Sequence, residues 1–188
     1  MFEPAARKRR LFVGIDLNPQ ARDACARILE ELRKTGFAAK YEEAEKLHVT
    51  LAFLGFVEPS RYEEIVSKLV EVGARSKAFS FLLDKLAAFP HERRPRVVYI
   101  GAHEQGAPFR MLAGELRNGY VPLGFEFRND SVAHVTIAKV KEAKRPLPLI
   151  ELVPIPLEVR ELVLFESLPN PAHRTSRYER LLTAPCRS

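Results

Sequence analysis

The chain has 188 residues, of which 46% are hydrophobic, and its formal net charge is +6. This composition excludes an intrinsically disordered chain and is sufficient for one compact domain. No apolar run approaches the roughly 20 residues of a membrane-spanning helix, and the basic N-terminal segment lacks the apolar region of a signal peptide. We therefore expect a cytoplasmic protein without a membrane partner, and the positive charge favours polyanionic partners such as nucleic acid.

Strand and helix patterns alternate along the first half of the chain. RLFVGIDL (10–17) predicts a buried strand, and 18–36 predicts an amphipathic helix that ends near Gly36. A strand is expected over KLHVTLAFLGF (46–56) and a second amphipathic helix over 60–76, directly after Pro59.

The second half restarts this pattern. The sequence predicts a basic turn, a helix, a proline-punctuated loop and several strands; in chain order these are a strand at 79–89, the turn PHERRPR at 90–96, a strand at 97–102, a helix at 106–118, strand material at 125–128 and 133–140, the loop around Pro146, Pro148, Pro154 and Pro156, and strands at 158–168 and 177–185. No linker separates the halves. We therefore predict one α+β domain over 1–188, with mainly antiparallel sheets and helices outside.

Two segments place polar residues within an apolar run. LHVTLAFLG contains His48 and Thr50, and AHVTIAKV contains His134 and Thr136 at the same spacing. Residues i and i+2 of a strand lie on one face, so each histidine points in the same direction as its threonine. A single such histidine is more often structural than catalytic, but the repetition makes coincidence an unattractive explanation.

Strict alternation along these strands predicts one face toward a cleft and the other toward helices. Val49, Leu51 and Phe53 are expected opposite His48, with Ala52 back on the histidine side. The second segment follows the same pattern. Phe53 is therefore predicted in the core rather than in a site.

Pseudo-symmetry between the halves would bring the two imidazoles together. An unperturbed histidine titrates near pH 6.5, so one neutral and one protonated imidazole suit general acid–base chemistry. Threonine hydroxyls donate hydrogen bonds to phosphoryl oxygens without adding charge. A metal site would need further carboxylates or cysteines, which neither motif supplies nearby, so we expect no metal and no cofactor.

At these residues the sequence resembles the two-histidine (2H) phosphoesterase superfamily, whose signature is a pair of H-x-T/S-x motifs, here HVTL and HVTI. RLFVGIDL, LHVTLAFLGFV, the FP…RPRVVYIGA segment and LVLFESLP…RYERL resemble the RNA 2′,3′-cyclic phosphodiesterases, also called 2′-5′ RNA ligases. The resemblance covers nearly the whole chain. It implies two pseudo-symmetric α+β lobes around a central cleft.

The resemblance also implies an activity. Family members open RNA 2′,3′-cyclic phosphates to 2′-phosphates without a metal, and some join RNA halves through a 2′-5′ bond. Carried over, His48 is the proton donor and His134 the proton acceptor, while Thr50 and Thr136 hold phosphoryl oxygens. The implied partner is RNA with a 2′,3′-cyclic phosphate end, such as a tRNA fragment, and we expect a monomer.

Three positions depart from the family pattern. Relatives commonly have proline directly before the second histidine, where this chain has Ala133. They carry arginine shortly before that histidine and just after the motif; the corresponding candidates for substrate binding here are Arg128 and Lys139. Lysine does not fully replace an arginine that makes two parallel hydrogen bonds, so the affinity for substrate or the preference among substrates is expected to differ.

Other residues receive weaker assignments. Tyr178 is a candidate for stacking on a base. The arginines of the 90–96 turn are interpreted as a solvated loop, with contact to RNA phosphates as the alternative. No role is assigned to 7–10, and loop positions are expected for His91, His103 and His173. Cys25 and Cys186 are expected to be free thiols.

Two rival functions stay open at this stage. One is a phosphodiesterase that acts on 2′-5′ oligonucleotides, and the other is a nucleotide- or RNA-binding module without turnover. The departures at Ala133 and Lys139 favour the second rival, and the presence of both histidines and both threonines argues against it.

Overall fold

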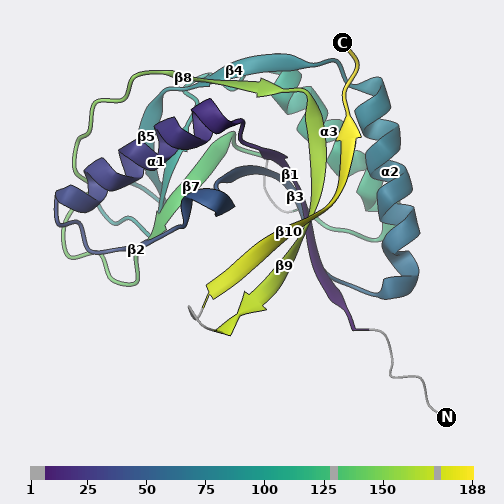
Figure 1. The fold of residues 1–188 in the computed structure, drawn as a ribbon, viewed down its shortest axis with the longest axis horizontal. Coiled ribbons are helices and arrows are strands. Elements are labelled where there is room, and N and C mark those ends of the chain that lie inside the picture. The colour runs from purple at the N-terminus through teal and green to yellow at the C-terminus, as the bar shows by residue number, and fades with distance from the viewer. Residues whose placement is uncertain (1–6, 128–130, 172–174) are drawn as a thin grey trace.

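The computed structural model describes residues 7–127, 131–171 and 175–188. Strands and helices mix along the chain in an α+β fold (Figure 1). The elements are β1 (Arg9–Asp16), α1 (Pro19–Lys34), β2 (Lys40–Tyr41), η1 (Ala44–Lys46), β3 (His48–Val57), η2 (Pro59–Arg61), α2 (Tyr62–Arg75), β4 (Phe79–Leu83), β5 (Lys85–Phe89), β6 (Val97–Gly101), α3 (Gly106–Tyr120), η3 (Val121–Leu123), β7 (His134–Lys139), β8 (Ile155–Val159), β9 (Glu161–Asn170) and β10 (Thr175–Pro185).

One large antiparallel sheet runs through both halves of the molecule. Its strand order is β10-β9-β1-β3-β7-β6-β5, with β2 paired to β7, and a separate pair is formed by β4 and β8. Strands β3 and β7 join the two halves, and their register consists of the single pair Val49–Val135. The predicted α+β class with mainly antiparallel strands is confirmed.

The helices cover the sheet from outside. Helix α1 contacts β7 and β8, whereas α2 packs on α3, β9 and β10, and α3 also contacts β3 (Figure 1). Helix α1 begins after Asn18, whose side chain accepts a hydrogen bond from the Ala21 amide, and Pro19 occupies its first turn. Its buried face consists of Ala21, Cys25, Leu29 and Leu32, which recur every three or four residues as in an amphipathic helix.

Three details of the predicted elements are wrong. The segment 79–89 forms two strands in different sheets, because the chain turns at Asp84, whose carboxylate accepts a hydrogen bond from the His103 amide at 2.7 Å. Residues 125–127 form no strand, and Arg128 lies outside the described residues. Pro156 belongs to β8 rather than to a loop; β8 pairs only with β4, and such an edge strand tolerates a residue without an amide hydrogen.

A register shift in β3 changes which side chains face the histidine. Val13 pairs with Ala52, but its neighbour Gly14 pairs with Thr50, so Leu51 is an extra residue opposite β1. Leu51 and Ala52 are consequently both fully buried, and the alternation reverses after them.

The prediction that Phe53 lies in the core is therefore wrong. Its side chain is 49% exposed, and Phe53 pairs with Phe12, whose ring lies 4.9 Å from that of His48. Directly paired residues share a face of the sheet, so Phe53 lies on the histidine face.

Strand β7 repeats the irregularity. Val98 pairs with Ala138 while Tyr99 pairs with Thr136, which leaves Ile137 as the extra residue. Ile137 and Ala138 are both fully buried, and Lys139 emerges after them on the histidine face. Both HVT strands are thus bulged at the same motif position.

We expect Gly14→Ala to destabilise the protein by about 1–3 kcal/mol through overpacking. A Cβ at Gly14 would lie 2.7 Å from the Val49 carbonyl oxygen and 3.5 Å from Cδ2 of His48. The control is Gly114→Ala in α3, where an added Cβ meets no atom within 4 Å and helix propensity should stabilise the protein by up to about 1 kcal/mol. Urea unfolding measures both changes; equal effects would contradict this account of Gly14.

Candidate active site

Local backbone contacts orient the first histidine. The Nδ1 atom of His48 lies 2.7 Å from the Lys46 carbonyl oxygen, so Nδ1 carries a hydrogen and donates it. The Nε2 atom lies 2.9 Å from Oγ1 of Thr50. In the neutral imidazole, Nε2 therefore accepts from the Thr50 hydroxyl and is the nitrogen available for proton transfer.

Aromatic rings from three neighbouring strands pack around His48. The ring centroid of His48 lies 4.9 Å from Phe12, 5.8 Å from Phe165 and 5.2 Å from Tyr178. Phe12 and Phe165 also stack on each other at 4.9 Å. These contacts fix the plane of the imidazole and remove water from one side of it.

The second histidine is held in a closely similar way. Nδ1 of His134 lies 2.8 Å from the Val132 carbonyl oxygen, again two residues earlier in the chain. The rings of Phe89 and Tyr99 lie 5.3 and 5.4 Å from its ring. Each HVT strand therefore presents an imidazole with a fixed Nδ1–H and an Nε2 atom left for chemistry.

The strand pairing gathers both motifs on one face. Val49 and Val135 are paired and fully buried, so the polar residues on either side of each valine point to the opposite face. His48, Thr50, His134 and Thr136 are all partly exposed there. The structure thus brings together the four residues that the sequence singled out.

Burial lowers the pKa of both histidines. For His48 this desolvation is opposed by the hydrogen bond to the Lys46 carbonyl and reinforced by the nearby charge of His134. For His134 it is opposed only by the hydrogen bond to the Val132 carbonyl. The carboxylates of Asp16 and Glu42 favour the protonated form of His48.

An arginine holds the turn that leads into His48. Arg22 of α1 donates to the Ala44 carbonyl at 2.7 Å and to the Leu47 carbonyl at 3.2 Å, and it forms an ion pair with Asp16. These contacts hold the turn that contains the Lys46 carbonyl. Arg22 was missed by the sequence reasoning, since an arginine on a helix carries no motif.

A glutamine holds the chain on either side of Val132, whose carbonyl bonds His134. The Gln105 side-chain amide donates to the Ser131 carbonyl at 3.2 Å, and its Oε1 accepts from the Ala133 amide at 2.9 Å. A proline at 133 has no amide hydrogen to donate. Ala133, which stands where relatives commonly have proline, therefore supplies an amide hydrogen that Gln105 accepts. No sequence signal pointed to Gln105.

The bulged residues have satisfied carbonyls. The Leu51 carbonyl accepts from the Ser131 hydroxyl at 2.9 Å and from Arg117 at 3.1 Å. The Ile137 carbonyl accepts from the Glu42 amide at 2.9 Å. These bonds replace the ladder partners that each bulge removes and so stabilise it.

The structure distributes the remaining candidates differently. Tyr178 packs on His48, as described above. Lys139 is exposed and forms an ion pair with Glu42 at 2.6 Å, and its charge affects the pKa of Tyr178. Arg128 and His173 lie outside the described residues.

The candidates of the 90–96 turn are exposed. Arg93 and Arg94 lie at the tip of the turn, and Arg96 donates to the Lys141 carbonyl. His91 is also exposed, whereas His103 pairs with Asp84 at 3.0 Å.

Within residues 7–127, 131–171 and 175–188, no group of three or more His, Cys, Asp or Glu side chains could hold a metal ion, and no helix is long and apolar enough to span a membrane. Cys25 and Cys186 are free thiols, as expected.

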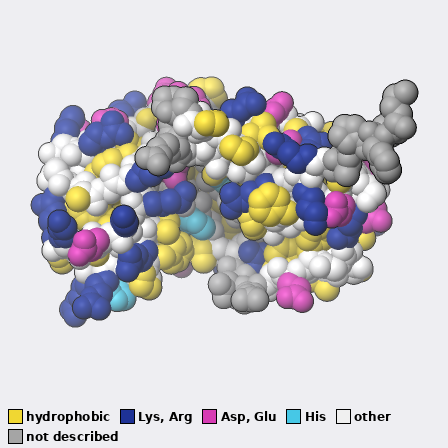
Figure 2. Space-filling model, turned by 90° about the horizontal axis from the view of Figure 1, so that it is seen from below, with side chains coloured by type: hydrophobic (Ala, Val, Ile, Leu, Met, Phe, Trp, Pro, Cys, Tyr) yellow, Lys and Arg dark blue, Asp and Glu magenta, His cyan; other side chains and the backbone are white. Residues whose placement is uncertain are grey.

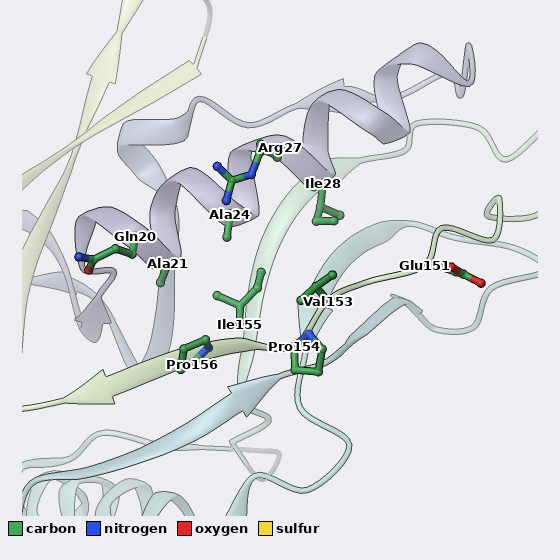
Figure 3. A pocket seen from close by; sticks show the side chains of 10 residues that line it. All are labelled: Gln20, Ala21, Ala24, Arg27, Ile28, Glu151, Val153, Pro154, Ile155 and Pro156. Carbon is green, nitrogen blue, oxygen red and sulfur yellow. The ribbon is translucent and has the colours of Figure 1, made fainter.

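A cavity of about 410 Å³ lies between α1 and the chain at 151–156 (Figure 3). Ala24 and Ile28 of α1 and Val153 and Ile155 of the facing chain contribute to its largely apolar lining. None of the candidate catalytic residues lines it, so this cavity is separate from the histidine site.

A bilobal α+β fold in which two His-x-Thr strands meet at the centre defines the two-histidine phosphoesterase class. Residues 15–99 match the family model of LigT-like phosphoesterases. An RNA 2′,3′-cyclic phosphodiesterase of Thermotoga maritima is 31% identical over 166 residues, which cover 86% of this chain and 88% of that protein. One of Archaeoglobus fulgidus is 38% identical over 132 residues, 70% of this chain and 73% of that protein. The chain belongs to the LigT-like phosphoesterase family.

Solved structures agree on the fold. Escherichia coli LigT in its apo form superimposes with a TM-score of 0.82 at 22% identity, covering 97% of this chain and all of that one. A protein of Thermus thermophilus gives a TM-score of 0.81 at 24% identity, covering 95% of this chain and 98% of that one.

We expect Gln105→Ala to lower kcat for phosphodiester hydrolysis about tenfold or more, because residues 131 and 133 lose the side chain that holds them, and the Val132 carbonyl between them no longer fixes His134 as firmly. A second variant, Ala133→Pro, removes the amide that Gln105 Oε1 accepts from and should lower kcat in the same direction. Steady-state kinetics on a 2′,3′-cyclic phosphate substrate measure both effects. Unchanged kcat with a normal melting temperature in both variants would contradict the positioning role.

Acidification should destabilise the protein through the two histidines. Their pKa values are lower in the folded chain than the ordinary value near 6.5, so the unfolded chain binds more protons just below that pH. The free energy of unfolding should therefore fall between pH 7.5 and pH 5. Thermal unfolding should show a smaller fall in the double variant His48→Gln/His134→Gln, whereas His91→Gln, an exposed control, should keep the native dependence. Equal pH dependence in all three proteins would refute this.

Proposed function

We propose that the protein hydrolyses RNA 2′,3′-cyclic phosphate ends to 2′-phosphates. The observation that carries this proposal is the pair of imidazoles, each with Nδ1–H bound to a backbone carbonyl and each sharing a sheet face with a threonine. The relatives of Thermotoga maritima and Archaeoglobus fulgidus are named for this activity, which supports the choice of substrate.

The reaction needs two proton transfers. Neutral His134 takes a proton from water through Nε2 as the water oxygen attacks the phosphorus atom. Protonated His48 gives a proton to the departing 3′ oxygen as its bond to phosphorus breaks, which leaves the phosphate on the 2′ oxygen. Each transfer contributes about 10²–10⁴-fold to the rate.

The direction of transfer is supported by charge as well as by the resemblance. Asp16 and Glu42 favour the protonated form of His48, and no carboxylate of the described residues has such an effect on His134. The protonated form is the one that a proton donor needs, and burial holds the pKa of both imidazoles below the ordinary value.

The two threonines complete the proposed site. Protonated His48 no longer accepts from the Thr50 hydroxyl at Nε2, so the Thr50 and Thr136 hydroxyls, which lie on the face of the histidines, donate to the phosphoryl oxygens as negative charge develops there. Tyr178, Lys139 and Arg128 are proposed substrate-binding residues. Lys139 would exchange its surface ion pair with Glu42 for a phosphate contact, since exposed pairs contribute little stability.

Further parts of the proposal rest on the resemblance or on the sequence pattern alone. Independence from metal, the ability to form 2′-5′ bonds in the reverse direction, a tRNA-fragment substrate, a monomeric state and a cytoplasmic location stay predictions.

The deciding experiment incubates the protein, in the presence of EDTA, with a short RNA that ends in a 2′,3′-cyclic phosphate. The native protein should convert this end to a terminal 2′-phosphate, which is identified by its resistance to 3′-nucleotidase. His48→Ala and His134→Ala should each lose more than about a hundredfold in kcat/KM, because each removes one proton transfer.

His91→Ala serves as the control, since that histidine is exposed on the 90–96 turn. Retained activity in either active-site variant would refute its assigned role. Binding without turnover by the native protein would favour an RNA-binding module, and cleavage only of 2′-5′ oligonucleotides would favour the other rival phosphodiesterase.

A further inference from the structure

Aromatic and cationic side chains continue the histidine face outward along four strands. Paired residues share a face, so Phe53, Phe12 and Phe165 form one row across β3, β1 and β9 next to His48. The following row consists of two pairs, Phe56 with Arg10 across β3 and β1, and Ser167 with Tyr178 across β9 and β10. We call these two rows the outer strip.

The two rows differ in how their aromatic rings are covered. Phe12 and Phe165 are buried against His48, whereas Phe53 is 49% exposed and Phe56 is 73% exposed. The guanidinium of Arg10 lies over the Phe53 ring at 5.1 Å. Exposed aromatic rings next to a cation are the combination that binds single-stranded nucleic acid, since bases stack on rings and phosphates meet cations.

Arg10 is available for a new electrostatic contact. Within the described residues, no carboxylate lies within ion-pair distance of its guanidinium, although its charge affects the pKa of Tyr178. Its neighbour Lys8 pairs with Glu58 on the surface at 2.6 Å, whereas Arg7 reaches the buried Glu166 at 3.3 Å. An exposed pair such as Lys8–Glu58 contributes about 0–1 kcal/mol and exchanges readily for a phosphate.

A groove follows the strip. It has a volume of about 590 Å³ and is lined by Arg7, Lys8, Arg10, Phe56, Ser167, Pro169, Thr175 and Ser176. Figure 2 shows a histidine in the hollow between the two halves of the molecule and, on the half to its right, hydrophobic side chains interleaved with Lys and Arg. The groove is thus cationic, and it shares Arg10, Phe56 and Ser167 with the second row of the outer strip.

We propose that the outer strip is a subsite for the RNA strand on the 5′ side of the terminal cyclic phosphate. This inference rests on the proposed function, because an RNA with a 2′,3′-cyclic phosphate continues in the 5′ direction only and has to leave the site along one surface. Arg10 contacts the next phosphate, and Phe53 and Phe56 stack on the preceding bases. The ligand is single-stranded RNA with little base preference, since every base offers a ring face.

The opposite half of the molecule offers a poorer path. The 90–96 turn presents the exposed Arg93 and Arg94, but the aromatic rings nearest to it, Phe89 and Tyr99, stack on each other at 4.4 Å and pack on His134. Charge alone attracts RNA there, whereas the outer strip combines charge, exposed rings and a groove.

The test compares two ligands that differ only in the 5′ strand: adenosine 2′-phosphate and a five-nucleotide RNA that ends in a 2′-phosphate. Binding is measured by calorimetry, so no turnover is required. The native protein should bind the RNA about tenfold or more tightly than the mononucleotide. Arg10→Ala and Phe56→Leu should each weaken RNA binding about fivefold or more. Each should therefore reduce the difference in affinity between the RNA and the mononucleotide.

Salt dependence separates a phosphate contact from a structural effect. For Arg10→Ala, the slope of log affinity for the RNA against log salt concentration should decrease by about 0.7, the value for one phosphate on a single strand. The matched control is Arg110→Ala, which removes the same charge from an exposed position on α3 and should change neither affinity nor slope.

Three results would refute the proposed RNA subsite. They are equal affinity of the native protein for both ligands, an equal loss of RNA affinity in Arg110→Ala, and a loss of RNA affinity confined to Arg93→Ala. Turnover of the same five-nucleotide RNA with a 2′,3′-cyclic phosphate end is measured in parallel. No turnover of that RNA, together with the predicted binding pattern, would refute the proposed function but not the RNA subsite.

Discussion

The site depends on the single contact at which the two halves of the sheet meet. Val49 and Val135 are paired and fully buried, and this pair fixes the histidines and threonines on either side of them on one face. Because side chains alternate with a period of two, a shift of one residue in either strand would bury the histidine of that strand and expose its valine. The apolar core beneath β3 and β7 therefore enforces the geometry of the polar face above it.

The residues around the two imidazoles fix their orientation and lower their affinity for protons. Each Nδ1–H is bound to a carbonyl two residues earlier, and rings from neighbouring strands pack on each imidazole. The same packing removes water and lowers both pKa values. The carboxylates of Asp16 and Glu42 partly offset this effect at His48, so the two nearly equivalent positions differ in electrostatics.

The paired bulges extend the site beyond its motif. Leu51 and Ile137 are extra residues in their strands, and each reverses the alternation that follows. Phe53 and Lys139 consequently face the cleft instead of the core or the helices. A bulge at the same motif position thus places an aromatic side chain on the histidine face in one half and a cation there in the other half. The two sides of the site are therefore chemically different.

The sequence by itself determined the helices, most strands and the two histidine–threonine pairs, because hydrophobic periodicity and a repeated four-residue pattern are local signals. It also predicted that each histidine shares a face with its threonine, which requires only the geometry of one strand. The placement of Phe53 was wrong because a bulge depends on the pairing partner, and β1 is far away in sequence. Gln105 and Arg22 were missed for the same reason: their roles arise from carbonyls that only the folded chain brings within reach. Local pattern thus determined which residues could do chemistry, and long-range pairing decided which of them meet and what surrounds them.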